Sequence, residues 1–109
     1  MRQIRKYKAL FIIPINTERK LTDDGWEFKT KNSIPDNVKD LILSRFPNIS
    51  NSEDDCDTYR QEELIVDFCY TDDSFLESVY VRDYSVDLTY VAAFKELTND
   101  LKKIDVFAP

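Results

Sequence analysis

Carboxylates are the most abundant side chains in this chain that could do chemistry. One run places Glu53, Asp54, Asp55 and Asp57 around Cys56. Carboxylate oxygens are the ligands that Ca²⁺ and Mg²⁺ prefer, but this run lacks the alternating ligand spacing and the central glycine of an EF-hand loop. We therefore interpret it as a solvated loop whose charge favours contact with a basic protein partner, and we expect no metal site.

The residue types present offer little support for catalysis. Pairs of carboxylates could serve acid/base chemistry, but 21 Asp and Glu in 109 residues make such pairs expected by chance. Histidine is absent, so no imidazole can activate Cys56 or Cys69, and neither cysteine has a basic neighbour in the sequence. The single glycine, Gly25, excludes glycine-rich phosphate-binding loops. The sequence favours a binding protein over an enzyme, with no catalytic residue and no cofactor.

Tyr80, Arg82 and Tyr84 form the second notable pattern. Positions two apart on a strand project from the same face, and Tyr and Arg are enriched at the centres of protein interfaces. We predict that these three residues bind a partner together with the acidic run. The alternative is an ordinary exposed strand face that carries an Asp67–Arg82 cross-strand ion pair.

Charge is distributed unevenly along the chain, whose net charge is −6. The first 50 residues hold ten Lys and Arg against six Asp and Glu, whereas the remainder holds five against fifteen. An acidic surface repels phosphate backbones, and no basic-glycine-aromatic signature accompanies the tyrosines, so nucleic acid is not an expected partner. A basic protein partner fits this charge, although solubility alone would also account for it.

Seven segments have the patterning of regular structure, and five of them lie before residue 86. Residues 7–15 form a continuous β-prone run, with Pro14 near its end as expected of an edge or a strand terminus. Asp24-Gly25 is a turn signal before a short strand at 26–30 that could pair with the first strand. A helix is predicted over 35–46, because apolar residues recur there at spacings of three and four. Residues 63–70 and 78–85 alternate as an antiparallel hairpin.

Asp87 is the predicted N-cap of a last helix over 88–103, and a short strand follows at 106–107. Residues 47–62 lack an apolar period and are predicted to be a flexible acidic loop. Without the short strand at 26–30, the resulting order is that of a split βαβ, or ferredoxin-like, fold: an antiparallel sheet with two helices packed on one face, in a single α+β domain over 1–109. Trp26 is expected to close the core.

Basic residues precede the apolar run 9–13, as in a signal peptide, but Pro14 and Asn16 interrupt it and no small-residue cleavage site follows. We therefore expect a cytoplasmic protein that does not enter a membrane. The combined prediction is a non-catalytic protein-binding module, in the form of an acidic inhibitor or immunity-type protein that covers a basic partner surface. The alternative is a small-molecule-binding regulatory domain that acts as a dimer. A homodimer could form at an exposed sheet edge.

Overall fold

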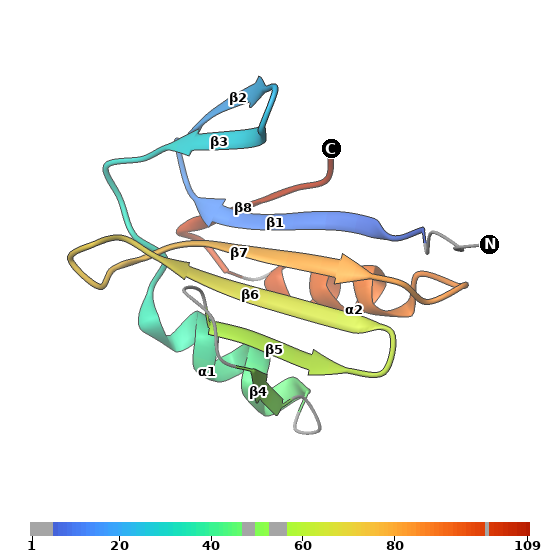
Figure 1. Cartoon of the computed structure of the whole chain (residues 1–109). Helices are drawn as coiled ribbons and strands as arrows, with labels where there is room; N and C mark the ends of the chain where they lie inside the picture. The colour runs from blue at the N-terminus through green and yellow to red at the C-terminus, as the bar shows by residue number, and fades with distance from the viewer. Residues whose placement is uncertain (1–5, 47–49, 53–56, 100) are drawn as a thin grey trace.

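The computed structural model describes residues 6–46, 50–52, 57–99 and 101–109, which form a mixed α+β structure (Figure 1). The elements follow one another as β1 (Lys8–Pro14), β2 (Glu18–Thr22), β3 (Gly25–Lys29), α1 (Asp36–Arg45), β4 (Ser50–Ser52), β5 (Asp57–Gln61), β6 (Leu64–Tyr70), β7 (Leu76–Asp83), α2 (Thr89–Thr98) and β8 (Ile104–Phe107). The mixed α+β class predicted from the sequence is confirmed, as are the first helix and the β6–β7 hairpin.

One large antiparallel sheet organises the molecule. Its strand order is β4-β5-β6-β7-β1-β8, so strand β1 lies between β7 and β8, which follow it in sequence by more than sixty residues. Strands β2 and β3 form a separate two-stranded hairpin. Among the described residues β4 and β8 are the outer strands, so each has a partner strand on one side of its backbone only.

Alternating side chains of the central strands form the core. Strands β6 and β7 bury alternate residues over most of their length, and β1 does so up to Ile12, as expected for a sheet with one face against helices. The buried cluster includes Val38 and Ile42 of α1 and Phe94 of α2 beside these strand residues. Its members from the three strands are Leu10, Ile12, Leu64, Val66, Phe68, Leu76, Val79 and Val81. The sheet face that carries this cluster is called the core face below, and the other the open face.

The prediction of an acidic loop over 47–62 is wrong in the described part of that range, because β4 and β5 are strands there. Strand β5 pairs with β6 along its whole length, with Thr58 opposite Asp67 and Tyr59 opposite Val66. Its residues are mostly polar, so the sequence carried no apolar alternation there. The strand at β5 is stabilised by its pairing with β6, which no local sequence pattern indicates. Residues 47–49 and 53–56 lie outside the described part of the chain.

The strand predicted at 26–30 is present as β3, but it pairs with β2 rather than with the first strand. The Asp24-Gly25 turn brings β2 and β3 together, and Gly25 has a φ of 112°, a conformation that favours glycine. The Thr22 hydroxyl donates a hydrogen bond of 2.9 Å to the Gly25 carbonyl. The strands β2 and β3 therefore pair with each other, in a sheet separate from the one that contains β1.

Helix α2 begins and ends differently from its prediction. Asp87 is not the N-cap; Leu88 takes that position with a φ of 53° and no side-chain cap hydrogen bond. The carboxylate of Asp83 instead accepts a 2.9 Å hydrogen bond from the Val91 amide. The end of β7 thus supplies the acceptor for the helix start, which only the tertiary arrangement allows.

The same helix ends at Thr98, five residues before its predicted end. The Thr98 hydroxyl donates to the Phe94 carbonyl at 2.7 Å, and the Leu101 amide bonds to the Thr98 carbonyl at 3.1 Å. The chain then returns to the sheet as β8, which begins at Ile104 instead of 106 because Ile104 pairs with Pro14. Within the described residues, neither helix is long and apolar enough to cross a membrane.

Candidate functional site

Strand β7 presents Tyr80 and Arg82 on the open face, and Tyr84 continues the same side just beyond its end. Their intervening neighbours Val81 and Asp83 are fully buried, whereas the three side chains are only partly buried. The Tyr84 amide bonds to the Glu63 carbonyl at 2.9 Å, which continues the β6–β7 pairing past the strand end. The structure thus brings together the three residues that the sequence predicted to share one face.

Aromatic contacts order this row. The Tyr80 ring stacks on Phe11 of β1, with centroids 4.6 Å apart and an interplanar angle of 7°. Its hydroxyl donates a 3.1 Å hydrogen bond to the Tyr7 hydroxyl, and the Tyr7 ring contacts Tyr84 at 5.1 Å. Tyr7, Tyr80 and Tyr84 are called the tyrosine cluster below. Sequence reasoning missed Tyr7. It lies two residues before Ala9 and four before Phe11, so the alternation of β1 places it on the same open face.

Arg82 is held against this cluster by a carboxylate. Its guanidinium lies 5.2 Å from the centre of the Tyr80 ring, and its Nη2 donates to Asp67 Oδ2 at 3.0 Å. The cross-strand ion pair that formed the alternative interpretation is therefore confirmed. It runs diagonally, because Arg82 is opposite Ile65 in the register while Asp67 is opposite Tyr80. Both partners are mostly buried, with side chains 25% and 14% exposed.

One hydrogen-bond donor of this group stays unused. Arg82 Nε is buried and has no hydrogen-bond partner among the described residues. A buried donor without an acceptor is costly and rare in folded proteins, so it calls for an explanation. The other oxygen of Asp67 accepts from the Thr58 hydroxyl at 2.7 Å.

The environment of Tyr80 keeps its phenol protonated. Burial raises the pKa of Tyr80 above its ordinary value, and the hydrogen bond to Tyr7 adds to the rise. The positive charge of Arg82 acts in the opposite direction on this pKa but does not outweigh burial. Tyr80 therefore serves as a hydrogen-bond donor at neutral pH, beside the cation of Arg82.

The acidic run is only partly within the described residues. Glu53, Asp54 and Asp55 lie outside them, so their predicted contact with a partner remains a prediction. Asp57 begins β5 and accepts a 2.7 Å hydrogen bond from Lys39 of α1, which also donates to the Tyr70 hydroxyl at 2.8 Å. Asp57 is thus used to join α1 to the sheet.

The ammonium of Lys39 is stabilised by its surroundings. It lies between 5.2 and 5.6 Å from the ring centres of Tyr59, Phe68 and Tyr70. Burial opposes its charge, but the hydrogen bonds to Asp57 and Tyr70 outweigh burial and raise the pKa of Lys39. This contact between a helix and two strands was not visible in the sequence, because its members are 18 and 31 residues apart.

The β2–β3 hairpin covers the part of the open face next to β1 and β8. Phe28 packs edge-on against Phe11 at 5.0 Å, and Trp26 packs edge-on against Phe107 at 4.7 Å. Ile13 is fully buried although its neighbours Ile12 and Pro14 point to the core face. Trp26 thus belongs to a second, smaller aromatic cluster with Phe107 and Phe28. The hairpin does not cover the part of the open face that β5, β6 and β7 form (Figure 1).

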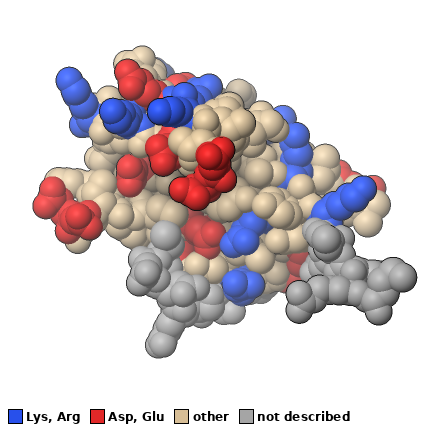
Figure 2. Space-filling view, turned by 45° about the horizontal axis from the view of Figure 1, so that its top comes forward, with Lys and Arg blue, Asp and Glu red and all other residues tan. Residues whose placement is uncertain are grey.

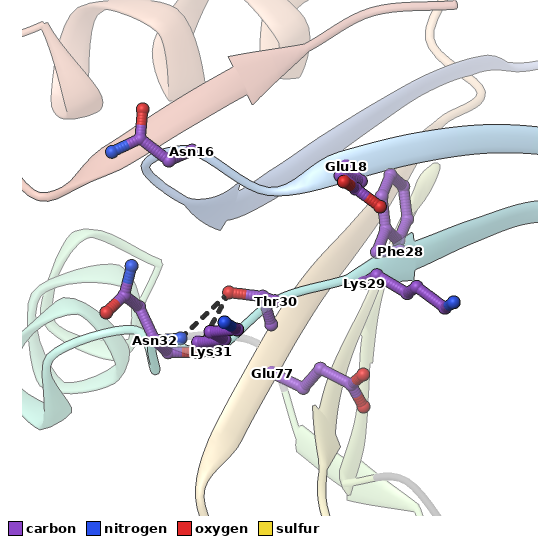
Figure 3. Close-up of a pocket in the computed structure, with 8 residues that line it drawn as sticks. All are labelled: Asn16, Glu18, Phe28, Lys29, Thr30, Lys31, Asn32 and Glu77. Carbon is purple, nitrogen blue, oxygen red and sulfur yellow. Dashed lines mark hydrogen bonds between the residues drawn. The ribbon is translucent and has the colours of Figure 1, made fainter.

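A groove of about 540 Å³ lies where this hairpin joins the linker to α1 (Figure 3). Its lining mixes both charges with amides and one ring: Asn16, Glu18, Phe28, Lys29, Thr30, Lys31, Asn32 and Glu77. Thr30 and Asn32 bond to each other within the linker, because the backbone amide of Asn32 donates to the Thr30 hydroxyl at 3.0 Å. Two lysines and two carboxylates in one open groove give no net preference for a charged ligand.

Charges of both signs are interspersed over the face in view, with several basic side chains at its top (Figure 2). Among the described residues, no group of three His, Cys, Asp or Glu side chains is placed to hold a metal ion. No protein-family model, no curated protein and no solved structure matches this chain. The geometry of the open face is therefore the basis for a functional proposal.

Proposed function

We propose that this protein is a protein-binding module without a catalytic role, and that Tyr80, Arg82 and Tyr84 form its contact surface. The observation that carries the proposal is the buried Arg82 Nε without an acceptor, set beside the tyrosine cluster. Its unused bonding capacity would be filled if a small shift on binding turned Arg82 toward a partner carbonyl or carboxylate. Tyr and Arg in such a group are the residues that dominate binding free energy at interfaces.

Preorganisation supports the same role. Tyr80 is fixed by its stack on Phe11 and its hydrogen bond to Tyr7, and Arg82 is fixed by Asp67. Side chains that are already ordered lose little rotamer entropy when a partner binds, so more of their contact energy appears as affinity. The β2–β3 hairpin covers the neighbouring part of the open face and limits the contact to β5, β6 and β7.

The acidic second half of the chain suggests a basic partner. In this proposal the protein is an acidic inhibitor or immunity-type protein, whose negative charge accelerates association with a basic surface. Because Lys39 neutralises Asp57, the steering charge falls on Glu53, Asp54 and Asp55. The charge and the tyrosine cluster then have separate roles: the charge speeds encounter, and the cluster slows dissociation.

We also propose that the core is ferredoxin-like, with two helices on one face and with β4, β5 and the β2–β3 hairpin as additions. The adjacency β6-β7-β1-β8 supports this, because it is the neighbour order that a split βαβ arrangement produces. The shared cluster of Val38, Ile42 and Phe94 with the sheet supports helices on the same face. This fold is common to many unrelated proteins and adds nothing to the functional proposal.

The test begins with capture of a partner on the immobilised protein, its identification by mass spectrometry, and binding kinetics with the purified partner. The variant Y80S/R82S is expected to raise the dissociation rate, because it removes the ordered contact surface. The variant E53K/D54K/D55K is expected to lower the association rate and its dependence on salt while leaving the dissociation rate nearly unchanged.

The matched control is K95E/E96K, which exchanges two exposed charges on α2 and preserves the net charge. Circular dichroism and urea denaturation establish that each variant is folded before its kinetics are compared. The proposal fails if no protein is captured above an uncoupled matrix, or if Y80S/R82S dissociates at the same rate as K95E/E96K.

A further inference from the structure

A second groove lies at the start of helix α2, beside the tyrosine cluster. It has a volume of about 480 Å³, and apart from the buried Asp83 it is lined by Lys6, Tyr7, Lys8, Tyr84, Ser85, Val86 and Leu88. Val86 is 95% exposed, and Tyr7 and Leu88 are exposed as well. An apolar surface of this kind, exposed in a described part of the chain, is typical of an interaction site.

Hydrogen bonds hold the apolar loop of this groove in place. Asp83 accepts from the Ser85 amide at 2.8 Å and from the Ser85 hydroxyl at 2.6 Å. The Ser85 hydroxyl oxygen in turn accepts from the Thr89 amide at 3.0 Å. Leu88 is kept at a φ of 53°, a strained value for a residue other than glycine. Val86 and Leu88 are therefore exposed from an ordered loop.

The exposed charged side chains that line the groove are both basic. Asp83 is fully buried, and its carboxylate is used by Ser85 and Val91, so it does not face an incoming ligand. Lys6 and Lys8 are both exposed; Lys8 donates a long bond of 3.3 Å to the Pro109 carbonyl. A complementary ligand would present an apolar side chain with carboxylates next to it. This groove is called the basic groove below.

The turn between β6 and β7 has these properties. Phe75 is 59% exposed, and Asp72 and Asp73 beside it are exposed too. The turn is ordered by bonds from the Thr71 amide to the Phe75 carbonyl at 2.8 Å and from the Ser74 amide to the Thr71 carbonyl at 2.9 Å. We call residues 71–75 the acidic turn. It lies at the opposite end of the sheet from the basic groove, so the two cannot meet within one molecule (Figure 1).

We propose that this protein associates with a second copy of itself, with Phe75 of one copy in the basic groove of the other. Asp72 and Asp73 then face Lys6 and Lys8, and the phenyl ring contacts Val86 and Leu88. Two copies in opposite orientation make the contact twice and form a closed dimer, whereas copies in the same orientation form a chain. The groove shares Tyr84 with the contact surface proposed above, but the docking contacts are made by Lys6, Lys8, Val86 and Leu88 and involve neither Arg82 nor Tyr80.

Charge exchange tests this contact directly. Sedimentation velocity over a series of protein concentrations is expected to show association of the wild type, weakened by salt. The variants K6E/K8E and D72K/D73K are each expected to remain monomeric, because like charges then meet at the contact. An equimolar mixture of the two variants is expected to associate again, since each groove now faces a turn of opposite charge.

Two controls separate this contact from a general effect of charge. K102E/K103E and D23K/D24K make the same charge changes at exposed positions outside the groove and the turn, and both are expected to associate like the wild type. F75S keeps the charges but loses the apolar contact, and it is expected to be monomeric.

A wild type that stays monomeric at all concentrations overturns the proposal. So does a mixture of the charge variants that fails to associate, or a D23K/D24K control that loses association as fully as D72K/D73K. Y80S/R82S is expected to associate normally here, which distinguishes this contact from the proposed partner surface.

Discussion

Two clusters in this protein place a cation beside aromatic rings and a carboxylate, and they differ in how completely the cation is satisfied. Lys39 donates to Asp57 at 2.7 Å and to Tyr70 at 2.8 Å. Arg82 donates to Asp67 at 3.0 Å, but its buried Nε has no acceptor among the described residues. The first cluster joins α1 to β5 and β6, whereas the second lies on the open face of the sheet.

The difference shows that similar residue types can hold a fold together or prepare a surface. The Lys39 contact has short bonds to two partners and would gain little from a third. The two cations are about equally exposed, but the carboxylate of the Arg82 contact is more deeply buried, at 14% for Asp67 against 43% for Asp57. The Arg82 contact is nevertheless incomplete, which is the state expected of a group that acquires a further acceptor on binding.

The largest effect is expected from R82M, which should lower the free energy of unfolding by about 2 kcal/mol because it leaves the mostly buried Asp67 without its cation. Urea denaturation at neutral pH measures this. The double variant D67N/R82M removes the uncompensated charge and should recover most of the loss. If R82M lost less stability than K39M, the Lys39 contact would contribute more to the fold than the Arg82 contact, against this prediction.

A smaller effect is expected from K39M, at about 1 kcal/mol, because the partly exposed Asp57 can be hydrated once the ammonium is removed. The same denaturation experiment measures it, with K95M as the control for loss of an exposed helical lysine. If K39M and K95M are equally stable, the Lys39 contact contributes nothing to the fold.

The smallest effect concerns the phenol of Tyr80, whose pKa is raised in the folded state. Because the folded protein holds this proton more tightly than the unfolded chain, its contribution to stability is present below the ordinary phenol value of 10.0 and declines as the pH rises above it. The variant Y7F removes the acceptor of the Tyr80 hydroxyl and should lower the pKa of Tyr80, as measured by tyrosinate absorbance. Y80F identifies the part of the titration that belongs to Tyr80; an unchanged pKa of Tyr80 in Y7F would mean that the hydrogen bond to Tyr7 does not raise it.

Local patterns sufficed for the elements whose apolar residues recur at a regular period. Helix α1 and the β6–β7 hairpin follow their predicted positions, since Val38 and Ile42 mark a helical face and Val79 and Val81 a strand face. The row of Tyr80, Arg82 and Tyr84 and the Asp67–Arg82 pair were also predictable, because these residues belong to the two adjacent strands of one hairpin. Period and turn signals are properties of short segments, so the sequence expresses them directly.

Other features depended on segments far apart in the chain. Strand β5 has almost no apolar alternation and exists because β6 pairs with it. Helix α2 takes its capping acceptor from Asp83 instead of Asp87, and Asp57 is used by Lys39 instead of remaining in an acidic loop. The free energy of these contacts arises only after the chain has folded and brought the groups within bonding distance, so no local pattern carries them.

By itself, the sequence determined the α+β class, the first helix, the central hairpin and the row of Tyr80, Arg82 and Tyr84. The tertiary structure alone decided that Tyr7 joins this row and that Arg82 Nε lies buried without an acceptor. It also decided that the basic groove and the acidic turn lie at opposite ends of the sheet. The physical reason is that burial, bond geometry and the placement of surface charge depend on the packing of whole elements, whereas period and turn chemistry depend on a few neighbouring residues.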